Sequence, residues 1–231
     1  MKFDVIDSDP PWDFSDRLTM SDVKRGAASQ YKILDDEAIK NLNVKEVAAD
    51  DSVLALWVPS SILQTGLDTM SAWGFRQTQT QIWVKVKNDP FKKLAKLVDK
   101  IAKGPYLLPV KKRETTILRK ALEEFDLDDI LNFKMGRLFR QTHEVCLIGV
   151  RGKVYKKLQN KSQRSVHFYR VGKHSEKPEI LQDRLDVMFP NAVKLEMFAR
   201  RCRPGWTCVG WECPGTEKED IRDSLERLIK L

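Results

Sequence analysis

The sequence predicts an α/β protein built around a doubly wound, mostly parallel sheet. Segments with strand character alternate along the chain with segments of helical periodicity, an order that is typical of parallel sheets covered by helices. Residues 52–58 form a continuous apolar run, as expected for a strand that is buried on both faces. The 231 residues are enough for one such domain with a sizeable core.

The first half of the chain contains three expected strands and two expected helices. Residues 2–8 are expected to form a strand, because an apolar run there ends at two prolines. A helix at 35–47 begins with Asp35, Asp36 and Glu37, and negative charge is favourable in a first helical turn. After the strand at 52–58, Ser60 is a candidate N-cap and Gly74 a candidate C-terminal residue for a helix at 60–73. Residues 77–85 are expected to form the next strand.

The second half continues the alternation. Residues 144–150 read as an apolar strand that ends at Arg151 and Gly152. A helix at 176–188 begins near Pro178, a residue that is accepted in the first turn of a helix. Strands at 192–198 and 207–211 and a charged helix at 217–231 complete the chain.

Residues 88–135 interrupt this rhythm. Helical patterns at 90–103 and 114–125 flank Gly104 and Pro105, which break helices. We therefore expect a single domain over residues 1–231, with a helical, basic insertion at 88–135.

Positive charge is concentrated in two segments of the chain, whose formal net charge is +8. Residues 85–140 contain 15 Lys or Arg and 8 Asp or Glu, whereas residues 151–177 contain 9 and 1. The second segment also interleaves Tyr155, Phe168 and Tyr169 with its basic residues. This distribution indicates nucleic-acid binding, although the lysines of the first segment could simply solvate exposed helices.

The tetrad Asp9-Pro10-Pro11-Trp12 follows the first expected strand directly. In an open α/β sheet, ligands bind beyond the carboxyl ends of the strands. Asp9 and the carbonyl of Pro10 could accept the two protons of an exocyclic aromatic amine, while Trp12 stacks on its ring. The alternative interpretation is a strand end and a proline turn with Trp12 packed in the core.

The tetrad resembles that of the N6-adenine methyltransferases, which include the catalytic subunit of the messenger-RNA adenosine methyltransferase and bacterial and phage DNA enzymes. Four further blocks resemble the same family in the same order. The first block comprises LALWV at 54–58, WGF at 73–75 and IWVK at 82–85. The others are the stretch 136–152, HSEKP at 174–178, and KLEMFAR at 194–200 before PGW. The order, with the catalytic tetrad first, is that of the permuted β-class enzymes. The resemblance implies a Rossmann-like methyltransferase sheet.

The resemblance also implies S-adenosylmethionine as the methyl donor. By position, Lys177 would bind the methionine carboxylate, and Glu196 and Arg200 would bind the ribose. Trp211 stands where the family commonly has Asn, and Arg201-Cys202-Arg203 stands where the messenger-RNA enzyme has a His-Asn pair. The residues expected to contact the adenine of the cofactor therefore differ from those of the family. The implied cofactor residues are Asp7, Asp9, Lys177, Glu196, Phe198, Arg200, Gly210 and Glu212.

The implied reaction is an in-line transfer of a methyl group to the amine of a flipped adenine, catalysed through Asp9, Pro10, Pro11 and Trp12. DNA is favoured over RNA, because the chain is short and the stretch 140–144 resembles bacterial and phage members. A cytosine- or glutamine-modifying enzyme and a non-catalytic partner subunit are the alternatives. The implied substrate contacts are Trp12, Tyr31, Lys85, Arg140, Lys156, Lys157, Lys161 and Arg164. The basic segment 151–177 is expected to border the strand ends, because Val150 ends a strand and Lys177 belongs to the implied cofactor site.

Other classes of protein are disfavoured. No apolar run approaches a membrane span, and the first residues enter a strand without a signal peptide. Cys202, Cys208 and Cys213 lack the spacing of a zinc site, so no metal is expected. The expected location is the cytoplasm, or the nucleus of a eukaryote, and the protein could form a homo- or heterodimer.

Overall fold

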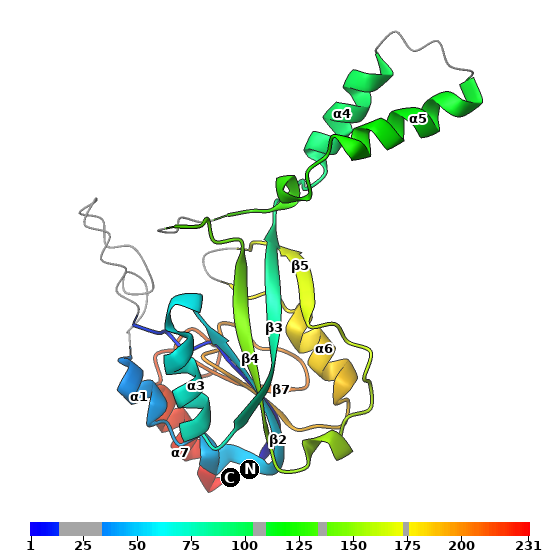
Figure 1. Cartoon of the computed structure of the whole chain (residues 1–231). Helices are drawn as coiled ribbons and strands as arrows, with labels where there is room; N and C mark the ends of the chain where they lie inside the picture. Colours follow the sequence, from blue (N-terminus) through cyan, green and yellow to red (C-terminus); the bar gives the residue numbers. More distant parts are fainter. Residues whose placement is uncertain (14–33, 104–109, 134–137, 173–175) are drawn as a thin grey trace, which may run out of the picture. The chain divides into compact units, whose positions relative to one another are not determined.

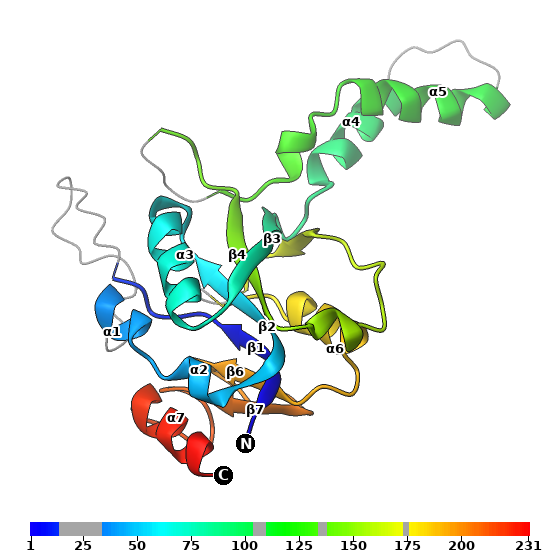
Figure 2. The same cartoon turned by 60° about the horizontal axis from the view of Figure 1, so that its bottom comes forward.

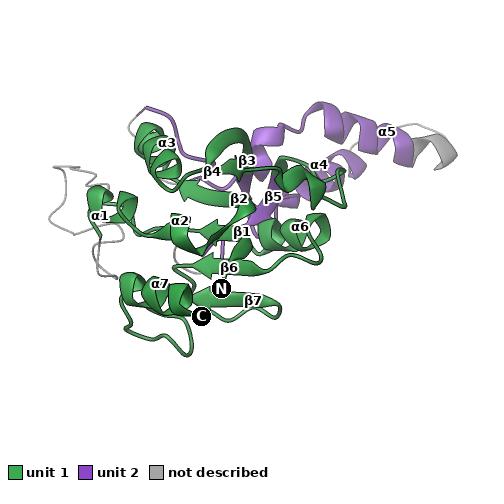
Figure 3. Cartoon of the chain, turned by 90° about the horizontal axis from the view of Figure 1, so that it is seen from below, with its two compact units in different colours: residues 1–82, 144–166, 179–231 green, residues 83–143, 167–178 purple. Residues whose placement is uncertain are grey.

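A computed structural model describes residues 1–13, 34–103, 110–133, 138–172 and 176–231 (Figure 1). The chain forms two compact units (Figure 3). The first unit comprises residues 1–82, 144–166 and 179–231, and the second comprises residues 83–143 and 167–178. The expected insertion at 88–135 falls within the second unit, and each unit is described by itself below.

The strands form one mixed, mostly parallel seven-stranded sheet, which confirms the predicted fold class. Its order is β5-β3-β4-β2-β1-β6-β7. The strands are β1 (Phe3–Ser8), β2 (Ala48–Val58), β3 (Arg76–Val86), β4 (His143–Arg151), β5 (Val166–Arg170), β6 (Lys194–Met197) and β7 (Trp206–Val209). β1 runs parallel to β2 and to β6, and β6 runs parallel to β7. Figure 2 shows β1 lying between β2 and β6.

The strand β4 runs antiparallel to β2. Val58, at the end of β2, pairs with Val145, and Ser52 pairs with Arg151, at the end of β4. β4 therefore ends at the edge of the sheet where β1 and β2 begin. Hydrophobic periodicity cannot reveal this direction, because a strand buried on both faces has the same composition in either orientation.

Helices cover both faces of the sheet in the first unit (Figure 3). The helices α1 (Asp36–Lys40), α3 (Leu63–Ala72) and α7 (Ile221–Lys230) lie against one face, and α6 (Ile180–Met188) lies against the other. The helix expected at 35–47 is two short helices, because Asn41 and Asn43 favour caps and turns over helix interiors. The helix expected from Ser60 starts as a 3₁₀ turn (Ser60–Ile62), and Gly74 ends it at φ +83°. The second of the two short helices is α2 (Val44–Val47).

The core of the first unit lies between the sheet and these helices. Phe3, Ile6 and Leu54 are fully buried on the strands, and Trp73 is fully buried at the end of α3. Burying a side chain of this size contributes about 1.5–3 kcal/mol. This packing fixes the strand ends that carry the candidate site. None of the described helices is long and apolar enough to cross a membrane.

The second unit contains α4 (Lys92–Ala102) and α5 (Val110–Glu123), close to the helical patterns expected at 90–103 and 114–125. The two helices pack together, with Ile101 on α4 and Ala121 on α5 buried. Trp83 Nε1 donates to the carbonyl of Tyr169 at 3.0 Å, which ties β5 to β3 inside this unit. We did not predict β5 from the sequence, because its five residues lie within the basic segment 151–177 and four of them are exposed.

Candidate active site

The carboxyl ends of four parallel strands meet at one edge of the first unit. Ser8, the last residue of β1, pairs with Leu56 on β2 and with Met197, the last residue of β6. Met197 in turn pairs with Val209, the last residue of β7. The Asp9–Trp12 tetrad and the segments after β6 and β7 therefore leave the sheet side by side.

The tetrad forms a tight turn that fixes the Pro10 carbonyl. The backbone N–H of Trp12 donates to the Pro10 oxygen at 2.9 Å, which is the i to i+2 hydrogen bond of a γ-turn around Pro11. The carbonyl oxygen has a second lone pair, so it can still accept a proton from a ligand. Asp9 is half-buried beside it. The turn thus provides two oriented acceptors within two residues.

Trp12 packs in the hydrophobic core, and only 3% of its surface is exposed. Its Nε1 donates to the carbonyl of Trp57 on β2 at 2.8 Å. This is the core-packing alternative that the sequence offered for the ring. The indole anchors the turn to the neighbouring strand, and stacking of Trp12 on a base stays a prediction.

Two carboxylates on neighbouring strands lie beneath this turn. Asp7 on β1 pairs in register with Glu196 on β6, and Asp7 is buried. Gln182, which is buried on α6, donates from Nε2 to Asp7 Oδ2 at 3.1 Å and also hydrogen bonds with Glu196. One neutral amide therefore serves two acidic groups that would otherwise repel each other.

The acid-base properties of Glu196 follow from this environment. Burial raises the pKa of Glu196 above its ordinary value, and the hydrogen bond with Gln182 opposes the shift. Cys208 Sγ lies 3.8 Å from Glu196 Oε2, and burial raises the pKa of this thiol to about 11. Cys208 is therefore a neutral neighbour of the carboxyl near neutral pH.

The segments after β6 and β7 approach each other closely at Gly210. A Cβ atom on Gly210 would lie 2.4 Å from the oxygen and 2.6 Å from the nitrogen of Ala199. The buried hydroxyl of Thr216 accepts from the Gly210 N–H at 3.1 Å and donates to the Gly210 oxygen at 3.0 Å. Only glycine fits this position, and Thr216 holds the loop in place.

Two of the expected cofactor residues meet across this approach. Arg200 Nε lies 3.6 Å from Glu212 Oε2, and both side chains are partly exposed. Phe198, the first residue after β6, has φ +60°, a backbone conformation that is rare for a bulky residue. Such strain persists where packing imposes it and is frequent at functional sites. Phe198 packs against the core, which supplies that constraint.

Comparison with known proteins identifies the family. The family model MT-A70 matches residues 3–130 and 125–212. The chain belongs to the MT-A70 family. This is a family of methyltransferases associated with N6-adenine methylation, as the resemblance of the tetrad implied.

The chain is also similar to individual methyltransferases from bacteria and eukaryotes. The chain is 25% identical over 233 residues to the type II methyltransferase M.MunI of Mycoplasma sp, covering 94% of this chain and 81% of that protein. It is 24% identical to the human N(6)-adenosine-methyltransferase catalytic subunit METTL3, covering 93% of this chain and 29% of METTL3. It is 23% identical to an MT-A70-like N(6)-adenosine-methyltransferase of Arabidopsis thaliana, of which it covers 24%. The chain thus spans most of the Mycoplasma protein and about a quarter of the eukaryotic ones.

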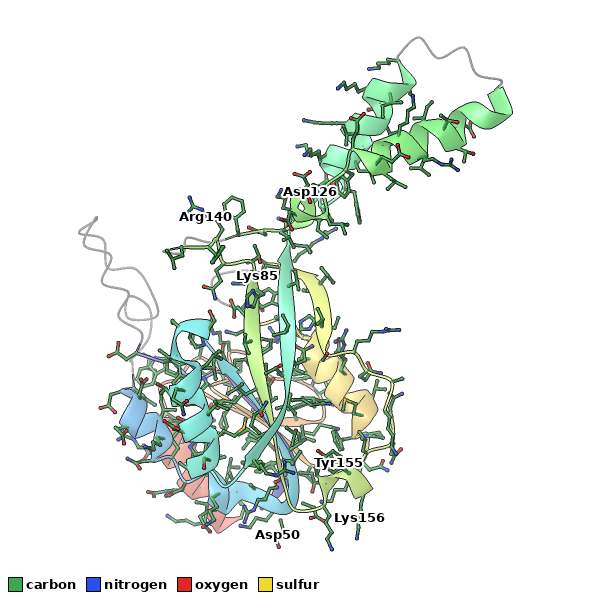
Figure 4. The ribbon with its side chains drawn as sticks, in the orientation of Figure 1. Asp50, Lys85, Asp126, Arg140, Tyr155 and Lys156 are labelled. Carbon is green, nitrogen blue, oxygen red and sulfur yellow. The ribbon has the colours of Figure 1, made fainter. Side chains whose placement is uncertain are left out.

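The expected site residues of this MT-A70 chain separate into groups. Asp7, Asp9, Glu196, Phe198, Arg200, Gly210 and Glu212 come together at the edge described above. Lys177, Lys85 and Arg140 belong to the second unit. There Lys85 is buried with Nζ 5.4 Å from the centre of the Trp83 ring, and the exposed Arg140 guanidinium is 5.9 Å from the Phe133 ring (Figure 4). Tyr31, His174 and Ser175 lie outside the described residues.

The basic segment after β4 is not where the sequence led us to expect it. Because β4 is antiparallel, the segment starts at the edge opposite the tetrad, where Figure 4 shows Lys156 near Asp50. Lys157 Nζ lies 2.6 Å from Asp4 Oδ1 at the start of β1. For Lys156 and Lys157, the expectation that this segment borders the carboxyl ends of the strands is therefore wrong. Nucleic-acid contact stays a prediction for four basic residues of this segment, but it no longer rests on their position in the sheet; they are Lys156, Lys157, Lys161 and Arg164.

The cysteines form no metal site among the residues that the structure describes. Cys202, Cys208 and Cys213 are free thiols near the segments after β6 and β7. Burial raises the pKa of Cys213 to about 12, so this thiol stays protonated near neutral pH.

Sequence reasoning missed Gln182 and Thr216. Gln182 stands on the buried side of α6, between the buried Leu181 and Leu185. A polar residue at a buried helical position was the available signal, and it does not reveal which strand residues the amide contacts. Thr216 is six residues from Gly210 in a loop, where spacing predicts no contact.

Proposed function

We propose that this chain is an S-adenosylmethionine-dependent N6-adenine methyltransferase that acts on DNA. The observation that carries the proposal is the Asp9–Trp12 turn at the end of β1, in which the Trp12 N–H orients the Pro10 carbonyl. Two acceptors in a rigid turn suit the two protons of an exocyclic amine. The family membership supports the same chemistry.

The residues beside the turn fit a nucleoside-containing cofactor. Buried carboxyl groups require N–H or O–H donors, and Asp7 and Glu196 present theirs side by side at the strand ends. Ribose hydroxyls are donors of this kind. Arg200 and Glu212 would contact the ribose or adenine end, and Lys177 would bind the methionine carboxylate. When bound, S-adenosylmethionine supplies an electrophilic methyl group on a sulfonium ion.

The main contribution of the chain to catalysis would be to align the adenine amine with the methyl group. Asp9 and the Pro10 carbonyl would accept from the 6-amino group and aim its lone pair at the methyl carbon. Orientation of reacting groups is worth about 7–11 kcal/mol in well-aligned systems. Because the amine becomes far more acidic once it is methylated, Asp9 or solvent can take the proton afterwards. Trp12 would hold the turn against Trp57 throughout.

DNA is favoured over RNA as the substrate. The stretch 140–144 resembles bacterial and phage members of the family, and the match covers 81% of the Mycoplasma type II methyltransferase and 29% of human METTL3. The identities, 25% and 24%, do not separate the two.

The test is a methylation assay with matched DNA and RNA oligonucleotides, read by mass spectrometry of the digested nucleosides. We expect N6-methyladenine in DNA with wild-type protein and at least about 100-fold less with Asp9→Ala. Product in RNA alone would overturn the DNA assignment. Calorimetric titration with S-adenosylmethionine is the companion measurement, because a non-catalytic partner subunit would yield neither product nor cofactor binding.

A further inference from the structure

The helix α4 carries its lysines on one face. At about 100° per residue in an α-helix, Lys92, Lys96, Lys100 and Lys103 fall within an arc of about 80°. All four are exposed. Lys93 lies at the margin of the arc and is paired with Asp129.

The opposite face of α4 is already occupied. Leu94, Leu97, Val98 and Ile101 point away from the lysine arc, and Ile101 is buried. α4 packs against α5, on which Ala121 is fully buried. The helix pair therefore has its own small apolar contact, and the lysine face is what α4 presents outward.

The four lysines concentrate positive charge with little to balance it. Asp99 is the one acidic residue of α4; it lies about 20° outside the arc, near Lys96 and Lys103, so it offsets at most one of the four charges. No ion pair to these four lysines is found among the residues that the structure describes. Like charges on neighbouring turns repel each other by a few tenths of a kcal/mol per pair. A polyanion would relieve that repulsion.

We infer that this lysine face binds the phosphate backbone of the nucleic-acid substrate, an inference that rests on the proposed function. From Lys92 to Lys103 the helix is about 16 Å long, which corresponds to about five phosphates of one DNA strand. Lysine binds phosphate as a point charge and reads no sequence. An anionic membrane is a poorer partner, because helices that bind membranes bury a free apolar face and α4 has committed that face to α5.

The experiment replaces Lys92, Lys96, Lys100 and Lys103 together by Gln, which removes the charge and keeps helix propensity. The affinity of the full chain for a duplex DNA is then measured over a range of salt concentrations. Each lost phosphate contact reduces the salt slope by about 0.9, so we expect a reduction of about 3–4. The loss should be similar for all duplex sequences, and turnover at saturating DNA should be unchanged.

The matched control removes the same charge elsewhere. Four exposed lysines of the first unit are replaced by Gln, namely Lys2, Lys45, Lys153 and Lys230. We expect this control to keep the wild-type salt slope. An unchanged slope in the α4 variant, or equal reductions in both variants, would overturn the inference, since the second result reports net charge alone.

A third arm tests the competing partners with the same proteins. If the α4 variant loses binding to vesicles containing phosphatidylserine, or to an acidic protein, while its DNA slope is unchanged, the face belongs to that partner and the inference fails. Wild-type protein that neither binds nor methylates nucleic acid overturns the proposed function and this inference together. Wild-type protein that methylates while the α4 variant keeps its slope overturns this inference alone.

Discussion

Gln182 Nε2 donates a hydrogen bond to Asp7 Oδ2 at 3.1 Å, and this contact joins helix α6 to the strand that leads into the Asp9–Trp12 turn. The same amide hydrogen bonds with Glu196, the register partner of Asp7 on β6. This neutral donor contacts both acidic side chains, and the charges of Arg201 and Arg203 also act on Glu196. The amide therefore joins the two acceptors that the proposed cofactor site uses, and it opposes the rise in the pKa of Glu196 that burial causes.

The first prediction concerns Glu196 and pH. Its pKa is raised in the folded protein, chiefly by burial, so its stabilising contribution is fully present below the unfolded value of about 4.5 and is lost as pH rises through the folded pKa. Glu196→Gln cannot ionise and escapes that loss. The free energy of unfolding of the variant relative to wild type should therefore increase between pH about 4 and about 8. Urea unfolding at intervals across this range measures it, and a constant difference would contradict the assigned protonation.

The second prediction concerns the approach at Gly210. Gly210→Ala would place a methyl group 2.4 Å from the Ala199 oxygen, so one of the two loops must move. Overpacking of this kind costs about 1–3 kcal/mol, and affinity for S-adenosylmethionine should fall at least about tenfold. Gly215→Ala is the control, since its methyl group meets open space and bears only the strain of φ +91°. Full cofactor affinity in Gly210→Ala would show that this loop pair does not form the binding site.

The sheet and the tetrad were accessible from the sequence because their signals are local. Apolar runs predicted six of the seven strands, and two prolines after β1 predicted where the chain leaves the sheet. β5 was missed because Val166–Arg170 is mostly exposed, and a strand at the edge of a sheet carries little hydrophobic pattern. Its aromatic residues were interpreted as part of a nucleic-acid-binding segment.

Strand direction and long-range contacts were not accessible. Nothing in residues 144–150 specifies that β4 runs antiparallel, yet this direction moves Lys156 and Lys157 away from the tetrad edge. Likewise, 175 residues separate Gln182 from Asp7, and only the packed fold brings them together. Residues that act through tertiary contacts leave no spacing pattern in a single sequence.

The third prediction concerns the anchor of the tetrad. Trp12→Phe removes the N–H that donates to Trp57, and the lost hydrogen bond to a buried carbonyl should lower stability by about 1–3 kcal/mol. Methyl transfer should fall as well, because the turn loses its attachment to β2. Trp73→Phe is the matched control, since it removes an N–H donated to Ile39 at 3.2 Å away from the turn. Equal stability in wild type and Trp12→Phe would show that the hydrogen bond to Trp57 does not anchor the turn.

The fourth prediction concerns the cofactor carboxylate. Lys177→Ala should weaken S-adenosylmethionine binding by about 1.5–3 kcal/mol, the value of a hydrogen bond to a charged group, and leave DNA affinity nearly unchanged. Lys103→Ala should weaken DNA binding and leave the affinity for S-adenosylmethionine unchanged, because that exposed lysine belongs to the lysine face of α4. Calorimetric titration and DNA binding of both variants separate the two roles. Equal cofactor affinities in wild type and Lys177→Ala would remove this lysine from the site.

The fifth prediction concerns the catalytic carboxylate. Asp9 stands half-buried next to the oriented Pro10 carbonyl, and the two are expected to align the amine together. Asp9→Ala should lower turnover by at least about 100-fold, or about 2.7 kcal/mol, while folding and cofactor affinity are retained. Asp9→Asn keeps one oxygen acceptor and should retain more activity than the alanine variant. Single-turnover methylation measures both, with Asp13→Ala as the control, an exposed carboxylate directly after the tetrad. If Asp9→Ala methylates adenine within a few-fold of wild type, alignment rests on the Pro10 carbonyl alone and the carboxylate has no part in the chemistry.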